Sequence, residues 1–85
     1  MIKVYKSKCI NNLSYDQTEF KSGELYFAYV IDSKIAVING DSRKGFCNME
    51  KCMLRHGHPY GFQKYFEVID TLYAKNEKEI RLLHL

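Results

Sequence analysis

GELYFAYVIDSKIAVIN, residues 23–39, decides the fold of this chain. Tyrosine, phenylalanine, valine and isoleucine dominate the stretch, and these side chains favour the pleated, half-buried surface of a β-sheet. Asp32-Ser33-Lys34 interrupts the apolar run, which predicts two strands joined by a tight turn. Successive strand residues point to opposite faces of a sheet, and both faces of this hairpin are apolar. We therefore expect a central hairpin, covered by a core on one side and at least in part on the other.

The segments on either side of the hairpin are predicted to add further strands. Residues 1–10 alternate apolar and polar side chains, and their lysines predict a strand near a sheet edge. Asn39-Gly40 is a strong turn dipeptide, so Arg43–Cys47 is expected to return as a short strand against the hairpin. Tyr65–Leu72 is predicted to be another strand. Glu79–Leu85 is too short for its periodicity to separate a last strand from a helical turn.

Two stretches outside these strands have a different character. Residues 11–17 are polar and turn-prone. Asn48–Gly57 is rich in helix formers, with Asn48 as N-cap and Gly57 as a stop, which predicts one short helix near Asn48–His56. The whole pattern predicts a single β-rich α+β domain, either a curved antiparallel sheet or a small SH3-like barrel.

Composition restricts the class of protein. The 85 residues are 46% hydrophobic and 27% charged, which is ordinary for one folded globular domain. No apolar run approaches the roughly 18 residues of a membrane span, and the N-terminus lacks a signal-peptide pattern, so we expect a cytoplasmic protein with no membrane partner. Three cysteines, an odd number, argue against a disulfide framework. A net charge of +3 is compatible with a polyanionic partner.

Two segments, KSGELYFAYVID (Lys21–Asp32) and GFQKYFEVID (Gly61–Asp70), resemble small SH3-like barrel proteins that are common in bacteriophage genomes. That family often carries a Lys-x-Gly-x-x-Tyr opening, a valine/isoleucine strand, a glycine-containing turn and a terminal Phe-Glu-Val-Ile strand. The matching positions are Lys21, Gly23, Tyr26, Ile35–Asn39, Gly40 and Phe66–Ile69. The resemblance covers about half of the chain; Asn48–Gly57 and the residues after Asp70 depart from it. It implies a phage accessory protein that binds host or phage macromolecules, and it transfers no catalytic residue.

A basic and aromatic set in the middle of the chain is the first candidate site. Cations neutralise phosphates, and aromatic faces stack on exposed bases. Residues 43–64 contain a single acidic residue, Glu50. The predicted nucleic-acid-binding residues are Arg43, Lys44, Lys51, Arg55, Tyr60, Phe62 and Lys64. A small curved sheet would present them to RNA, single-stranded or looped, more readily than to duplex DNA. Solvated lysines and core aromatics are the alternative explanation.

Cysteines and histidines form the second candidate cluster. Cys47, Cys52, His56 and His58 supply the donors of a Cys2His2 zinc site, but their spacing differs from that of common zinc fingers. Buried cysteines and loop histidines explain the same pattern, so we expect no cofactor. A nucleophilic Cys47 or Cys52 with His56, His58 or His84 as base has no local signature, and neither has a ribonuclease that uses the histidines. We therefore predict a protein that is not an enzyme.

Seven tyrosines motivate a second functional class, a protein-binding inhibitor or adaptor. Tyrosine is enriched at interface anchors, although it is also a good strand former. An edge strand, at residues 1–10 or in the C-terminal segment, would pair with a host or phage protein or with a second copy of the chain. In either class the expected mechanism is occupancy, in which the protein blocks or sequesters its partner.

Overall fold

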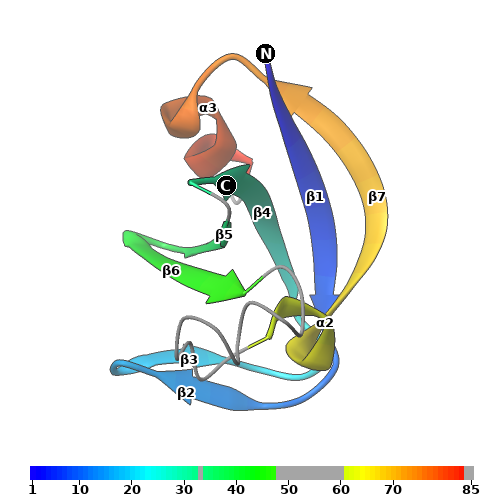
Figure 1. Ribbon diagram of the computed structural model, residues 1–85, viewed down its shortest axis with the longest axis vertical. Helices are drawn as coiled ribbons and strands as arrows, with labels where there is room; N and C mark the ends of the chain where they lie inside the picture. Colours follow the sequence, from blue (N-terminus) through cyan, green and yellow to red (C-terminus); the bar gives the residue numbers. More distant parts are fainter. Residues whose placement is uncertain (33, 48–60, 84–85) are drawn as a thin grey trace.

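The structure is a computed structural model that describes residues 1–32, 34–47 and 61–83. Short strands dominate it, with two short helices near its C-terminal end (Figure 1). The elements are β1 (Ile2–Cys9), β2 (Leu13–Tyr15), β3 (Thr18–Phe20), β4 (Leu25–Ile31), β5 (Lys34–Asn39), β6 (Ser42–Cys47), α2 (Phe62–Tyr65), β7 (Phe66–Ala74) and α3 (Glu77–Leu82). None of the helices in these ranges is long and apolar enough to cross a membrane.

Five strands form one antiparallel sheet in the order β6-β5-β4-β1-β7. Figure 1 shows that this sheet is strongly curved, with β6 and β7 at its two ends. The two end strands do not pair with each other, so the described strands form an open sheet and not a closed barrel. The predicted β-rich α+β fold is confirmed in the form of the curved sheet.

The hairpin predicted from residues 23–39 is present as β4 and β5. Its register pairs Phe27 with Ile38 and Val30 with Ile35, and β6 returns along the other side of β5 as expected. Gly40 lies in the turn between β5 and β6 with φ of 60°, a conformation that glycine adopts without a Cβ clash. The alternating apolar pattern was therefore a sound guide in this part of the chain.

β1 is not the edge strand that its lysines predicted. It lies between β4 and β7, and the side chains of Val4, Ser7 and Cys9 are fully buried. The prediction was wrong because each face of the sheet is covered only in part. Lysines of an inner strand can therefore reach water beyond the covered region.

The polar stretch at residues 11–17 belongs to a second, two-stranded sheet made by β2 and β3. Asp16 and Gln17 join the strands with φ of 50° and 67°. Both angles lie in the left-handed region, as in the tight turns that match the twist of a hairpin. The sequence predicted the turn but not its flanking strands, each of which is only three residues long.

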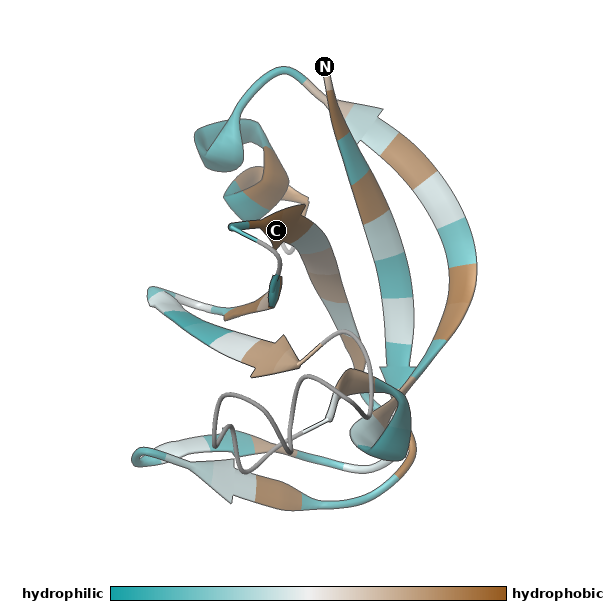
Figure 2. Ribbon diagram, in the orientation of Figure 1, coloured by the Kyte–Doolittle hydropathy of each residue, from teal (hydrophilic) through white to brown (hydrophobic). Residues whose placement is uncertain are grey.

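The five-stranded sheet carries an apolar core on each face. We call the face that bears Tyr26, Ala28, Ile35 and Val37 the aromatic face, because the phenylalanines of β3, β6, α2 and β7 pack on it. The rings form a network of edge-to-face contacts among Phe20, Tyr26, Phe46 and Phe66. Figure 2 shows the underlying pattern, in which hydrophobic and hydrophilic bands alternate along β1 and β7.

The opposite face, which we call the helix face, is covered by α3. Ile80 of α3 is fully buried among Val4, Phe27 and Tyr29. The helix begins at an Asn76 cap, whose side-chain oxygen accepts a hydrogen bond from the Glu79 N–H at 2.9 Å. The ambiguous C-terminal segment is thus helical as far as Leu82, while the predicted helix near Asn48–His56 lies outside the described residues.

Candidate functional site

Two neighbouring members of the predicted nucleic-acid set, Arg43 and Lys44, lie on opposite faces of β6. Arg43 Nη1 is 3.3 Å from Glu77 Oε2 and donates to the Tyr29 hydroxyl at 3.2 Å, and this hydroxyl contact is the main cause of its raised pKa. Lys44 Nζ is 3.2 Å from Asp16 Oδ2 on the other face. Successive strand residues point in opposite directions, and each cation already has an acidic neighbour.

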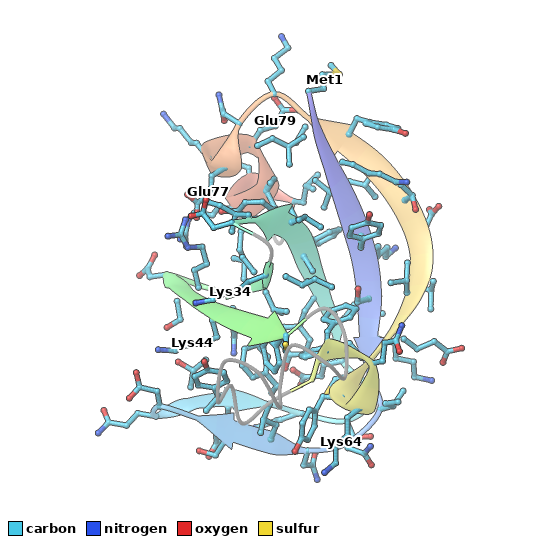
Figure 3. All side chains as sticks on the ribbon, viewed as in Figure 1. Met1, Lys34, Lys44, Lys64, Glu77 and Glu79 are labelled. Atoms are coloured by element: carbon cyan, nitrogen blue, oxygen red, sulfur yellow. The ribbon has the colours of Figure 1, made fainter. Side chains whose placement is uncertain are left out.

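The other described members of that set are separated in a similar way. Phe62 is only 3% exposed and stacks on Phe66, with ring centroids 5.2 Å apart. Lys64 is exposed on α2, with its ammonium group 5.7 Å from the centre of the Tyr65 ring. Figure 3 shows Lys44 beside β6 and Lys64 beside α2, well apart on the molecule. Arg43 thus lies on the other face of β6 from Lys44, and Phe62 is buried in the core. Lys51, Arg55 and Tyr60 lie outside the described residues.

Cys9 and Cys47, the cysteines within the described ranges, are buried and differ in their chemistry. Cys47 is disulfide-bonded, although the odd number of cysteines argued against a disulfide framework, and its sulfur is neither a free nucleophile nor a thiolate ligand. Cys9 is a free cysteine whose pKa is raised by burial. Within the described ranges, no three His, Cys, Asp or Glu side chains gather as a metal site. The remaining predicted ligands and bases, Cys52, His56, His58 and His84, lie outside those ranges.

One end of the sheet, strand β6, is occupied by other parts of the chain. The Tyr15 hydroxyl of β2 donates to the Gly45 carbonyl at 3.0 Å. Cys47, at the end of β6, forms an isolated parallel bridge with Gly61. These contacts occupy the Gly45 carbonyl and the Cys47 end of the β6 edge.

At the other end of the sheet, no strand in the described part of the chain pairs with the outer side of β7. The direction of its backbone groups follows from β1. The Cys9 N–H donates to the Glu24 carbonyl at 2.9 Å, and the Cys9 carbonyl accepts from the Gly23 N–H at 2.8 Å, so the Cys9 backbone faces β4. The next residue, Ile10, donates to the Tyr65 carbonyl on the β7 side. Odd-numbered residues of β1 therefore bond toward β4 and even-numbered ones toward β7.

This alternation assigns the outward-facing positions of β7. Thr71 and Tyr73 lie opposite Tyr5 and Lys3, whose backbone groups face β4. The N–H and carbonyl groups of Thr71 and Tyr73 consequently point away from the sheet. The Thr71 N–H agrees with this assignment, because it donates to the Asp70 carboxylate at 2.8 Å and not to β1.

A β-bulge divides the open edge. Lys6 lies opposite Asp70 and Ser7 opposite Val68, which leaves Ile69 as the extra residue of β7. Bulges and charged side chains are devices by which natural sheets limit unwanted pairing at an edge. The bulge and Asp70 therefore make this an edge that a strand can join only in a restricted register.

Large apolar side chains are exposed along this edge. On β7, Val68 is 45% exposed, Ile69 49% and Tyr73 60%. Val30, which is 48% exposed, lies farther inside the sheet on β4. The aromatic core does not reach this part of the aromatic face. Sequence reasoning missed these residues as surface residues because an apolar strand has the same pattern whether a neighbouring strand covers it or not.

A groove of about 510 Å³ lies beside the edge on the aromatic face. Phe62 and Phe66 form its inner wall, while Tyr5 and Val30 continue it across the sheet. Val68 and Glu67 of β7 contribute its outer rim. The groove is thus lined mainly by apolar residues, with Gln63 and Glu67 as its polar members.

Comparison of the chain with family models, with curated proteins and with solved structures gives no match.

Proposed function

We propose that this protein is a protein-binding inhibitor or adaptor that uses the β7 edge, and the groove beside it, to hold an extended segment of its partner. The observation that carries the proposal is the outward direction of the Thr71 and Tyr73 backbone groups next to exposed Val68. An added strand gains main-chain hydrogen bonds from such an edge and side-chain contacts from pockets beside it. The partner is blocked by occupancy, and no bond in it is changed.

The two ends of the sheet support β7 over β6 as the binding edge. β6 already has the Tyr15 hydroxyl on its Gly45 carbonyl, whereas β7 offers backbone groups and apolar side chains together. Exposed apolar side chains next to polar edges are typical of interaction surfaces. The occupied and the open end of one sheet thus differ in the features that partner binding requires.

Nucleic-acid binding, with RNA favoured, is the second candidate function. Lys64 supports it, because an exposed lysine beside the Tyr65 ring combines the cation and the aromatic face that nucleotides use. It ranks second because Arg43 and Lys44 lie on opposite faces and each has an acidic partner. A steep fall of affinity with added salt would support it. A phage accessory role stays a prediction from the sequence resemblance and is compatible with either function.

Affinity capture from a lysate, with and without nuclease treatment, tests the proposed function. Val68→Asp places a charge on the rim of the groove, and Asp41→Lys changes a charge in the exposed turn between β5 and β6 as a control. We expect the wild type and the control to retain the same protein and Val68→Asp to lose it.

Equal capture by all three proteins, with unchanged folding by circular dichroism, would contradict the assignment to β7. Capture that disappears after nuclease treatment would favour the nucleic-acid function instead.

A further inference from the structure

The charged side chains of β1 and β7 indicate the charge of a strand that would pair with the open edge of β7. On β1, Lys8 lies opposite Glu67 and Lys6 lies opposite Asp70. Two exposed carboxylates of β7 therefore lie beside two lysines of β1. Neither carboxylate takes part in an ion pair found in the described residues. Cross-strand pairs of opposite charge stabilise a sheet, so a further basic strand would extend this alternation.

A second copy of the chain is a poor occupant by the same reasoning. Two β7 edges that pair in a register placing their Glu67–Asp70 segments side by side would bring together carboxylates from both copies. Like charges directly opposite each other destabilise a strand pair. The edge therefore discriminates against self-association and favours a strand of different composition.

The groove sets the side-chain pattern on the other face of the incoming strand. Side chains of an added strand alternate between the two faces of the sheet. Those on the aromatic face would contact Val68 and enter the groove against Phe66 and Tyr5. Those on the other face would lie beside Glu67 and Asp70. Large apolar residues thus suit one set of positions and cations the other.

We infer that the occupant is a single extended segment of a partner protein in which large apolar residues alternate with lysine or arginine. This inference rests on the proposed function. The Asp70 carboxylate has a double role in it. In the free protein it accepts a hydrogen bond from the Thr71 N–H at 2.8 Å, so this N–H is not available to another strand. On binding, the incoming backbone carbonyl takes over the Thr71 N–H, and the carboxylate turns to a cation of the added strand.

Synthetic peptides of defined sequence test the inferred chemistry of the occupant directly. The probe is a labelled, end-blocked peptide of about eight residues that alternates lysine with valine or phenylalanine, a length that matches β7. In one control peptide every lysine is replaced by glutamate. In a second control peptide alternate backbone nitrogens are methylated. Fluorescence anisotropy at constant ionic strength measures binding, and amide NMR shifts locate it. We expect the lysine peptide to bind about tenfold more tightly than the glutamate peptide, and the methylated peptide to lose binding.

Variants of the protein test whether the carboxylates of Asp70 and Glu67 cause the preference for the lysine peptide. Asp70→Asn keeps an oxygen for the Thr71 N–H but removes the charge, and Glu67→Gln removes the second charge. We expect the double variant to lose most of the preference for lysine, while Asp41→Asn in the turn after β5 keeps it. Thermal unfolding followed by circular dichroism confirms that each variant folds.

The outcomes separate the two proposals. Equal or tighter binding of the glutamate peptide, or binding of neither peptide, overturns the inferred chemistry of the occupant. Dimerisation of the wild type through β7 in sedimentation overturns it as well. The proposed function falls if Val68→Asp leaves partner capture unchanged or if capture disappears after nuclease treatment.

Discussion

Tyr26 is the residue whose chemistry most clearly links stability to pH. Its ring lies in the aromatic core, its hydroxyl accepts from the Lys21 N–H at 2.9 Å, and it donates to Glu24 Oε2 at 3.1 Å. Burial is the largest cause of its raised pKa; the hydrogen bond from Lys21 opposes the shift, and the hydrogen bond to Glu24 and its charge add to it. A phenol whose pKa is raised on folding binds more protons in the folded state. Its contribution is complete below the unfolded pKa of about 10 and is lost as pH rises through the folded pKa.

Tyr26→Phe should therefore flatten the alkaline loss of stability. We expect the free energy of unfolding of the wild type to fall above about pH 10, and that of the variant to fall less steeply. At neutral pH the variant should lose roughly 1 kcal/mol because the hydroxyl contacts are gone. Urea unfolding at several pH values measures both effects, with exposed Tyr73→Phe as the control. Identical alkaline slopes for the wild type and Tyr26→Phe would disprove this role.

At the scale of elements, the assignment of inward and outward positions on β7 can be tested with proline. Proline has no N–H, so it is tolerated on an edge strand only where that N–H points away from the sheet. Tyr73→Pro should cost less stability than Leu72→Pro, which would remove a bond to Val4 of β1 and cost about 3 kcal/mol or more. Tyr73→Ala controls for loss of the side chain. Equal destabilisation by the two prolines in urea unfolding would mean that the alternation is assigned wrongly.

The elements also show which features of this fold are readable from its sequence. The hairpin of β4 and β5 was predictable because local alternation and a turn signal agree over residues 23–39. The position of β1 inside the sheet was not predictable, because strand order depends on pairing with residues far away in the chain. The candidate site was missed for the same reason. Val68 is exposed only because no described strand lies beyond β7, which a local pattern does not reveal.

At the scale of the whole molecule, the two cores share the strands β1, β4 and β5 and should unfold together. Ile80 of α3 is fully buried on the helix face, so Ile80→Ala should destabilise the protein by about 2–4 kcal/mol. Because the strands are common to both faces, the tyrosine side chains, among them Tyr26 on the aromatic face and Tyr29 on the helix face, should report the same lowered midpoint as the backbone signal. Tyrosine fluorescence and far-ultraviolet circular dichroism, recorded in the same urea titration, measure the two.

Exposed Leu82 on the same helix provides the control, because Leu82→Ala removes a side chain of the same kind that is 54% exposed. We expect it to change the midpoint little. Two separate transitions in Ile80→Ala, one for each probe, would show that the cores are independent units.

The pairing of β1 with β7 has a consequence for how the chain acquires its shape. Ile2 lies beside Ala74, so the inner strand of the sheet meets one of its two neighbours only after nearly the whole chain has been made. Contacts between residues so distant in sequence require closure of a long loop, and proteins rich in them fold slowly. During synthesis, β1 has no partner on its β7 side until β7 has been made. A nascent chain with an unpaired strand edge is prone to aggregate and is therefore expected to bind chaperones.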